Sequence, residues 1–177
     1  MSQVLLDEVV HTDYGQFDPV WSEDAIGFDG DPDRYFDAQV NGLVGAASGD
    51  GVYINLARRS GGSRVRVVLL DAEPPLPPPV FEDVVEVSIV IPGGATVLWL
   101  SWAGETSGEL GGIAPGSYRL RVSARGRDGG REGELAESVV DEYLVELWPA
   151  ADVREDAIVR VGSEDAKYWH SGWGGRR

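Results

Sequence analysis

The sequence predicts an all-β fold: an antiparallel two-sheet β-sandwich or jelly-roll-like domain over residues 1–150, followed by a short C-terminal helix. Three observations predict it. Apolar and polar residues alternate in several short segments, which is the period of a strand with one buried face. Turns rich in glycine and proline separate those segments. Hydrophobic residues make up 42% of the 177-residue chain, which is enough for one core and suits one domain.

The clearest strand signals are segments in which apolar residues occupy every second position. In residues 116–126, Tyr118, Leu120 and Val122 fall on one side of an extended chain, and arginines fall on the other. Such alternation predicts antiparallel strands with one buried and one solvated face. The segments with this pattern are 51–57, 83–91, 116–126 and 141–148.

Other strands are predicted from different patterns. Residues 65–70 and 95–102 are apolar on both faces, which indicates strands covered on each side. Residues 13–20 and 39–47 are weaker, because glycine and proline interrupt them. Residues 4–10 are a candidate edge strand. Together these segments give about eight to ten short strands, a number typical of a two-sheet sandwich.

Three segments do not fit the strand pattern. Residues 23–37 are acidic and rich in turn formers, so we expect a surface loop. Residues 74–79 contain five prolines, which cannot donate to a sheet, and we expect an extended connection between the sheets. Residues 151–177 form a C-terminal extension, in which Ser163 is placed to cap a short helix over 164–170 and the glycine-rich end is expected to be a flexible tail.

Charge is the strongest compositional signal. The chain has 30 acidic and 15 basic residues, a net charge of −15, and residues 1–50 alone hold eleven acidic residues and one arginine. Such a field repels nucleic acid and anionic membranes and speeds encounter with a basic protein. The simpler interpretation is that the acidity keeps the protein soluble. Cysteine, a signal-peptide pattern and an apolar run of about 20 residues are all absent from the sequence, which predicts a cytoplasmic protein.

No segment contains a motif strong enough to name a reaction, a cofactor or a metal. Residues 29–33 hold three aspartates at alternate positions, but Arg34 stands where a calcium-binding EF-hand loop needs glycine. The two histidines, His11 and His170, have no nucleophile motif beside them. The glycine pairs lack the lysine of a phosphate loop. The sequence therefore predicts no enzyme, no cofactor and no metal site.

Basic and aromatic residues have structural explanations. Four arginines share one parity near the strand at 116–126, and we expect cross-strand pairing with the strand at 141–148, with Arg119 opposite Glu146. Core packing accounts for most of the six tryptophans, whereas Trp21, beside carboxylates, suits an interface anchor. The four arginines are Arg119, Arg121, Arg125 and Arg127.

Four segments, in this order along the chain, resemble the bacterial competence nuclease-inhibitor (competence protein J-like) family. They are 13–17 (Asp-Tyr-Gly-Gln-Phe), 38–42 (Ala-Gln-Val-Asn-Gly), 115–120 (Pro-Gly-Ser-Tyr-Arg-Leu) and 141–147. The resemblance implies an all-β fold and a protein partner, with no catalytic residues to carry over. The acidic segment, the proline run and the residues after Pro149 look like additions. The chain also resembles uncharacterised proteins of high-GC actinobacteria, which imply no activity.

The leading hypothesis is an acidic protein-binding module that masks a basic nuclease or toxin, as an inhibitor or immunity protein does. Carboxylates of the N-terminal half would take positions that DNA phosphates otherwise occupy. The alternatives are a structural or assembly module that acts by self-association, and a carbohydrate-binding domain. The candidate partner-binding residues are Trp21, Glu23, Asp24, Phe28, Asp29, Asp31, Asp33, Tyr35, Phe36 and Asp37.

Overall fold

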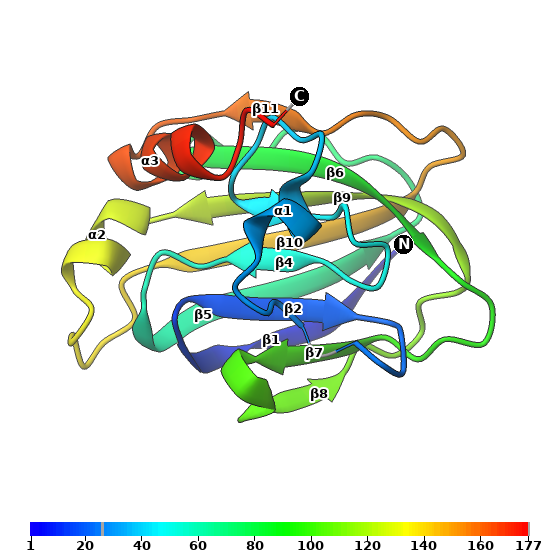
Figure 1. Ribbon diagram of the computed structural model, residues 1–177, viewed down its shortest axis with the longest axis horizontal. Helices are drawn as coiled ribbons and strands as arrows, with labels where there is room; N and C mark the ends of the chain where they lie inside the picture. Colours follow the sequence, from blue (N-terminus) through cyan, green and yellow to red (C-terminus); the bar gives the residue numbers. More distant parts are fainter. Residues whose placement is uncertain (26, 177) are drawn as a thin grey trace.

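The computed structural model describes residues 1–25 and 27–176; Ile26, in the acidic segment, and Arg177, in the tail, lie outside the described residues. In this part of the chain, eleven strands form one sheet of six and one of five, with three short α-helices and one 3-10 turn (Figure 1). The predicted all-β class is confirmed.

The two sheets take their strands from both halves of the chain. Across the six-stranded sheet the order is β1 (Ser2–Asp13), β5 (Ser60–Leu70), β10 (Glu142–Pro149), β9 (Gly116–Arg125), β6 (Asp83–Ile91) and β11 (Ala157–Arg160). Across the five-stranded sheet it is β3 (Val44–Gly45), β4 (Tyr53–Asn55), β2 (Gln16–Val20), β7 (Leu98–Ser101) and β8 (Ser107–Glu109). The helices are α1 (Pro32–Phe36), η1 (Trp102–Gly104), α2 (Arg127–Glu132) and α3 (Glu164–Gly172).

Side chains of both sheets fill one hydrophobic core. Phe17 and Trp99 of the five-stranded sheet stack with their ring centroids 5.5 Å apart. They belong to the same buried cluster as Val65, Val87 and Val145 of the six-stranded sheet. The apolar positions of 83–91 and 116–126 therefore face the core as the alternation predicted, and β6 and β9 lie where those patterns placed strands.

The six-stranded sheet is mixed, so the expectation of a strictly antiparallel fold is wrong. β10 pairs with β5 in parallel and with β9 antiparallel. β6 is antiparallel to β9, and it therefore runs parallel to β5 with β10 and β9 between them. A connection between two parallel strands of one sheet has to cross the face of that sheet.

The proline-rich segment is this crossing connection, and not the link between sheets that we expected. It joins β5 to β6 within the six-stranded sheet. The carbonyl oxygens of Pro74 and Pro75 accept hydrogen bonds from Arg121 Nη1 at 3.3 and 2.9 Å, and Arg160 donates to the carbonyl oxygen of Pro78 at 3.1 Å. Proline lacks an N–H but keeps its carbonyl group, so this segment supplies acceptors to arginines of the sheet that it covers.

Cross-strand pairing of the arginines occurs, but in a different register from the predicted one. Arg121, and not Arg119, lies opposite Glu146. Arg119 and Arg121 are buried, and their Nε atoms donate to the two carboxylate oxygens of Glu86 at 3.1 and 2.8 Å. Arg127 does not belong to the strand at all, because it begins α2.

The outer face of β4 is not solvated as the alternation predicted. Tyr53 and Asn55, which point away from the core residue Ile54, are only 1% and 2% exposed. Tyr53 packs against Phe36 of α1 and against Trp173 near the C-terminus, at centroid distances of 6.1 and 5.6 Å. These segments lie over the five-stranded sheet (Figure 1).

β7 is less covered than predicted, whereas the outer face of β4 is more covered than predicted. It was expected to be covered on both faces, but Leu98 is 39% exposed while Trp99 faces the core. Alternation indicates which face of a strand is apolar and which is polar. Whether either face is covered depends on the other segments that pack on it.

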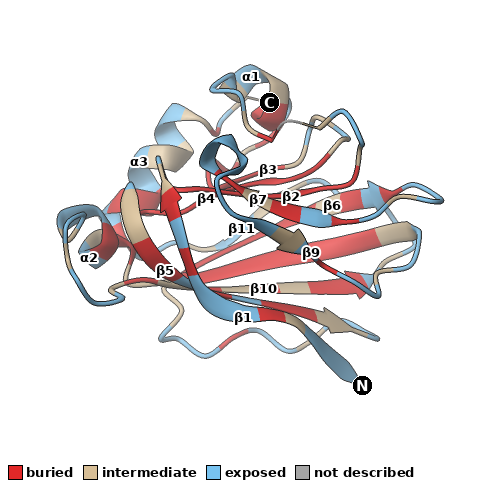
Figure 2. Ribbon diagram, turned by 90° about the horizontal axis from the view of Figure 1, so that it is seen from below, coloured by how far each residue is buried: buried red, intermediate tan, exposed pale blue. Residues whose placement is uncertain are grey.

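The C-terminal extension is built into the fold. β11 pairs with β6, and Ser163 caps α3 as predicted by accepting a hydrogen bond from the N–H of Ala166 at 3.0 Å. We expected the tail to be flexible, but its backbone is hydrogen-bonded to the rest of the protein: the N–H of Arg176 donates to the carbonyl oxygen of Gln39 at 2.9 Å. Figure 2 shows β9 as largely buried and the start of β1 as exposed.

Glu86→Gln removes the charge that two buried guanidinium groups share while it keeps the size of the side chain. We expect the free energy of unfolding, measured by urea denaturation, to fall by about 3 kcal/mol, as for other broken buried ion pairs. Glu109→Gln, at an exposed position of β8, serves as the control and should change it by less than about 0.5 kcal/mol. Equal stability of the Glu86→Gln and wild-type proteins would contradict the inference that this carboxylate holds both arginines.

Candidate functional site

The acidic segment at 23–37 is partly neutralised from within. Asp31 accepts a hydrogen bond from the N–H of Asp33 at 3.0 Å and so caps α1. Asp29 forms an ion pair with Arg34 at 3.2 Å, and Asp33 forms one with Arg176. The hydrogen bond from the N–H of Asp31, and then the neighbouring Arg34, lower the pKa of Asp29. These three aspartates therefore have structural roles.

The other acidic candidates are exposed and have no such role. Glu23, Asp24 and Asp37 are exposed, and none of them forms an ion pair within the described part of the chain. Asp50 adds a further carboxylate nearby but shares Arg34 with Asp29. In the described residues of this segment, Glu23, Asp24 and Asp37 are therefore the carboxylates that make neither an ion pair nor a capping hydrogen bond.

The aromatic residues proposed as anchors lie inside the protein. Trp21, Tyr35 and Phe36 are all buried. The indole N–H of Trp21 donates to the carbonyl oxygen of Gly49 at 2.9 Å, and the Tyr35 hydroxyl donates to that of Gly27 at 2.8 Å. These rings hold the segment against the five-stranded sheet, so a partner cannot reach them in this conformation. Phe28 is half-buried and stacks on Tyr53 at 4.0 Å.

A carboxyl group lies buried beneath this segment. Asp18, on β2, accepts hydrogen bonds from the N–H of Phe28 at 2.8 Å and from the Gln16 amide, while its Oδ1 has no partner among the described residues. Burial raises the pKa of Asp18 to about 7, and the two hydrogen bonds oppose the shift. The sequence did not reveal this group, because a polar residue at an outward position of a strand is typical of a solvated face.

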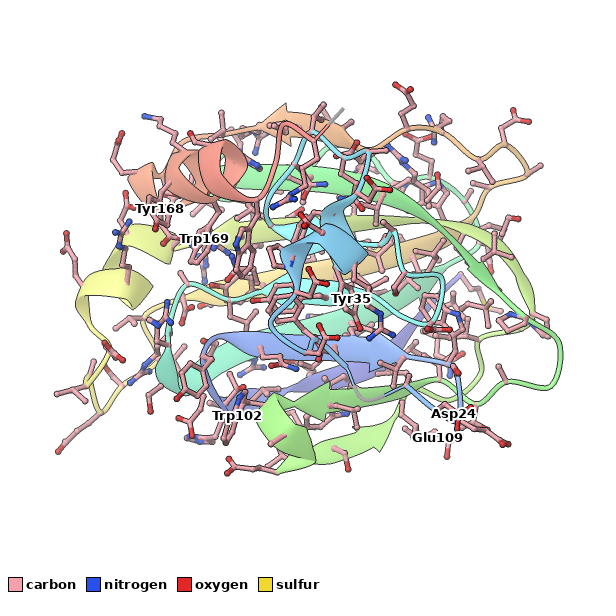
Figure 3. All side chains as sticks on the ribbon, in the orientation of Figure 1. Asp24, Tyr35, Trp102, Glu109, Tyr168 and Trp169 are labelled. Atoms are coloured by element: carbon pink, nitrogen blue, oxygen red, sulfur yellow. The ribbon has the colours of Figure 1, made fainter. Side chains whose placement is uncertain are left out.

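Next to the covered face, an open cleft of about 650 Å³ lies at one end of the five-stranded sheet. Gln16, Asn55 and Leu56 contribute to its lining from β2 and the β4 region. Figure 3 shows Tyr168 and Trp169, from α3, on one side of this end of the molecule and Trp102, from η1, on the other. The aromatic lining includes Tyr14, Phe28, Trp102, Tyr168, Trp169 and Trp173.

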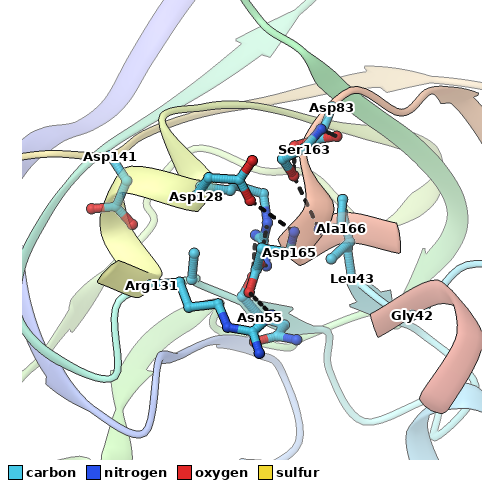
Figure 4. A network of polar contacts seen from close by, with 12 residues as sticks. Gly42, Leu43, Asn55, Asp83, Asp128, Arg131, Asp141, Ser163, Asp165 and Ala166 are labelled. Atoms are coloured by element: carbon cyan, nitrogen blue, oxygen red, sulfur yellow. Dashed lines mark hydrogen bonds and ion pairs between the residues drawn. The ribbon is translucent and has the colours of Figure 1, made fainter. Parts of the chain in front are cut away.

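A buried ion pair ties α2, α3 and β4 together beside the cleft. The Arg127 Nη2 atom lies 2.7 Å from Asp165 Oδ2, and both side chains are at most 2% exposed. Arg127 also donates to the carbonyl oxygen of Asn55 at 2.6 Å, and Asp128 accepts from the N–H of Asp165 at 2.8 Å (Figure 4). The pair therefore sets the position of α3, which carries Tyr168 and Trp169.

The cleft residues come from segments that are far apart in the sequence. Trp102 was expected in the core but is 37% exposed, and Arg127 was expected on a strand face. The six tryptophans of the chain were the one sequence signal that indicated the aromatic residues of the cleft. Nothing in the local pattern indicated that Tyr14 and Trp102 would meet, with ring centroids 5.1 Å apart.

A metal-binding cluster and a membrane-spanning helix are both absent from residues 1–25 and 27–176. Within these residues, no group of three or more histidine or acidic side chains is arranged to hold a metal ion. No helix formed by them has both the length and the apolar character needed to cross a bilayer.

Two solved structures are similar to this chain. No family model and no curated protein sequence matches it. ComJ from Bacillus subtilis, an inhibitor of the DNA-degrading activity of NucA, aligns with a TM-score of 0.57 and 17% identity over 85% of this chain and 99% of ComJ. The protein of crocagin biosynthetic gene J aligns with a TM-score of 0.56 and 15% identity over 84% and 98% of the two chains. At these identities the likeness is one of fold, as the resemblance noted in the sequence implied.

Asp18→Asn tests the buried carboxyl group. Because its pKa of about 7 in the folded state lies above the value of about 4 for an unfolded chain, the folded state binds the proton more tightly. The wild-type protein should therefore lose stability as the pH rises from about 4 to about 7. We expect the variant, which cannot ionise, to be more stable than wild type above about pH 7, with the difference shrinking toward about pH 4. Urea denaturation across this range measures it, and a difference independent of pH would refute the assignment.

Proposed function

We propose that this protein is a non-catalytic binding protein that masks a basic surface of a DNA-degrading nuclease. The likeness to ComJ, which spans 85% of this chain and nearly all of that inhibitor, carries the proposal. An inhibitor needs a rigid surface of the right shape and charge, and a two-sheet scaffold with a shared core supplies the rigidity.

The charge distribution supports this proposal. The net charge of −15 attracts a cationic protein and raises its association rate. Within the described residues, Glu23, Asp24 and Asp37 are the exposed carboxylates of the acidic segment that form neither an ion pair nor a capping hydrogen bond, so they can meet arginine or lysine of a partner. A nuclease binds DNA phosphates through such residues, and carboxylates at those positions compete with the phosphates. By the same electrostatics, nucleic acid and anionic membranes are not the partners.

Neutralisation of the three free carboxylates tests the proposal. The immobilised protein should retain a DNA-degrading activity from a lysate of its source at low ionic strength, release it at high ionic strength, and inhibit it when added back. The triple variant Glu23→Gln, Asp24→Asn, Asp37→Asn should bind that nuclease about tenfold more weakly or worse.

A matched variant separates this effect from a general loss of charge. Glu132→Gln, Glu134→Gln, Glu137→Gln removes three exposed carboxylates from α2 and the segment after it. This control should bind the nuclease as the wild-type protein does. Failure to retain any DNA-degrading activity, or equal binding by both triple variants, would overturn the proposal.

The exposed edge of the six-stranded sheet favours a second candidate function, self-association. β1 is an edge strand of 12 residues, and Val4 and Val9 on it are exposed. Unpaired backbone groups on a long edge strand can pair with another chain. If this surface joins two copies, light scattering should give a dimer for the wild-type protein and a monomer for Val9→Lys; a monomer in both cases would exclude it.

A further inference from the structure

The cleft beside α3 has two facing aromatic walls. Tyr14 and Trp102 form one wall with ring centroids 5.1 Å apart, and Tyr168 and Trp169 form the other, also 5.1 Å apart. Trp102, Tyr168 and Trp169 are labelled in Figure 3. Tyr14 and Tyr168 are 59% and 56% exposed. Rings that leave so much area in contact with water around an open volume of about 650 Å³ are suited to stacking on a ligand.

The charged residues of the cleft lining are two aspartates and two arginines, so the lining lacks the acidic excess of the protein as a whole. Its two carboxylates already have cationic partners: Asp165 pairs with Arg127, and Asp29 with Arg34. The remaining charged residues in the lining are arginines. Arg59 is exposed and forms no ion pair within residues 1–25 and 27–176.

Arg131 is the second cleft arginine, and its charge is only weakly compensated. Its side chain is 51% exposed and its Nη1 atom lies 4.0 Å from Asp165, whose carboxylate is held by Arg127. The Arg131 guanidinium also lies 5.0 Å from the ring of Tyr168, so a cation and an aromatic wall share one side of the cleft. Figure 4 shows Arg131 extending from α2 toward Asn55.

We propose that this cleft binds an aromatic ring that carries a carboxylate. The ring stacks between the two walls, and the carboxylate accepts charge-assisted hydrogen bonds from Arg59 and Arg131. A cationic ligand would meet two arginines, and a neutral sugar would leave both guanidinium groups without an anion. A polyanion such as nucleic acid is repelled by the net charge of −15, whereas a single carboxylate feels mainly the charges within a Debye length of about 8 Å.

Two sources present this chemistry: a free aromatic acid, and an aromatic residue at the C-terminus of a partner protein. The inference is independent of the proposed nuclease inhibition, because Glu23, Asp24 and Asp37 do not line the cleft. Failure of one proposal therefore leaves the other standing.

Titration with N-acetylphenylalanine, followed by NMR of the tryptophan indole N–H signals, tests the site. Trp102, Trp169 and Trp173 line the cleft, so their signals should move. The buried Trp21 and Trp148 are internal controls, and their signals should stay in place. N-acetylphenylalanine amide, which has the same ring without the charge, should bind about tenfold more weakly or worse.

Variants assign the two halves of the interaction. Arg59→Gln with Arg131→Gln should remove the preference for the acid over the amide, and Trp102→Ala should weaken both ligands. Arg66→Gln, an exposed arginine of β5 outside the cleft, should leave both affinities unchanged. The absence of any movement of the cleft signals at ligand concentrations on the order of millimolar, or equal binding of acid and amide, would overturn the proposal.

Peptides distinguish the two sources. A peptide that ends in phenylalanine with a free carboxylate is compared with N-acetylphenylalanine and with the same peptide amidated. Tighter binding of the free-ended peptide than of N-acetylphenylalanine identifies a protein C-terminus as the occupant. Binding of N-acetylphenylalanine without binding of the peptide identifies a free aromatic acid.

Discussion

The outer face of the five-stranded sheet has to be kept away from water, and much of the structure follows from this constraint. Tyr53, Asn55 and Asp18 lie on that face and are buried. Two segments cover it: the acidic segment from the N-terminal part of the chain, and the residues after α3 from the C-terminal part (Figure 1). Polar groups enclosed in this way need internal partners. The Arg127–Asp165 ion pair is one of these interactions, and it joins α2, α3 and β4.

The outer face of the six-stranded sheet around β9 is also buried, and it is covered in a different way. The proline-rich crossing segment shields Arg121 from solvent and supplies carbonyl acceptors, while Glu86 neutralises Arg119 and Arg121. Trp148 is buried on this side, with the Arg121 guanidinium 5.0 Å from its ring. The outer face of the five-stranded sheet and that of β9 are therefore covered by segments that carry little regular structure but make specific hydrogen bonds, whereas the outer face of β1 and β5 is exposed at Val9, Arg64 and Arg66.

This arrangement separates two surfaces of opposite character. Asp29 and Asp33 pair with arginines and Asp31 caps α1, so fewer carboxylates of the acidic segment are free of internal contacts than its composition indicates. In the cleft, Arg59 and Arg131 are available to an anion because both carboxylates of the lining are paired with other arginines. A protein with a net charge of −15 can therefore have a local region that favours an anion. This is possible because salt screens the distant carboxylates, so that the nearby arginines dominate there.

The sequence alone determined the β class, the bounds of β6 and β9, the edge position of β1 and the Ser163 cap, because each depends on local patterning or on one residue and its near neighbours. Only the tertiary structure decided which residues face each other. A shift of two residues in strand register keeps every side chain on its own face, so alternation cannot distinguish Arg119 from Arg121 as the residue opposite Glu146. The same holds for the covered outer faces, the burial of Asp18 and the aromatic cleft. They depend on which distant segments lie together, as those of Tyr14 and Tyr168 do around the cleft, and this leaves no periodic pattern in the sequence.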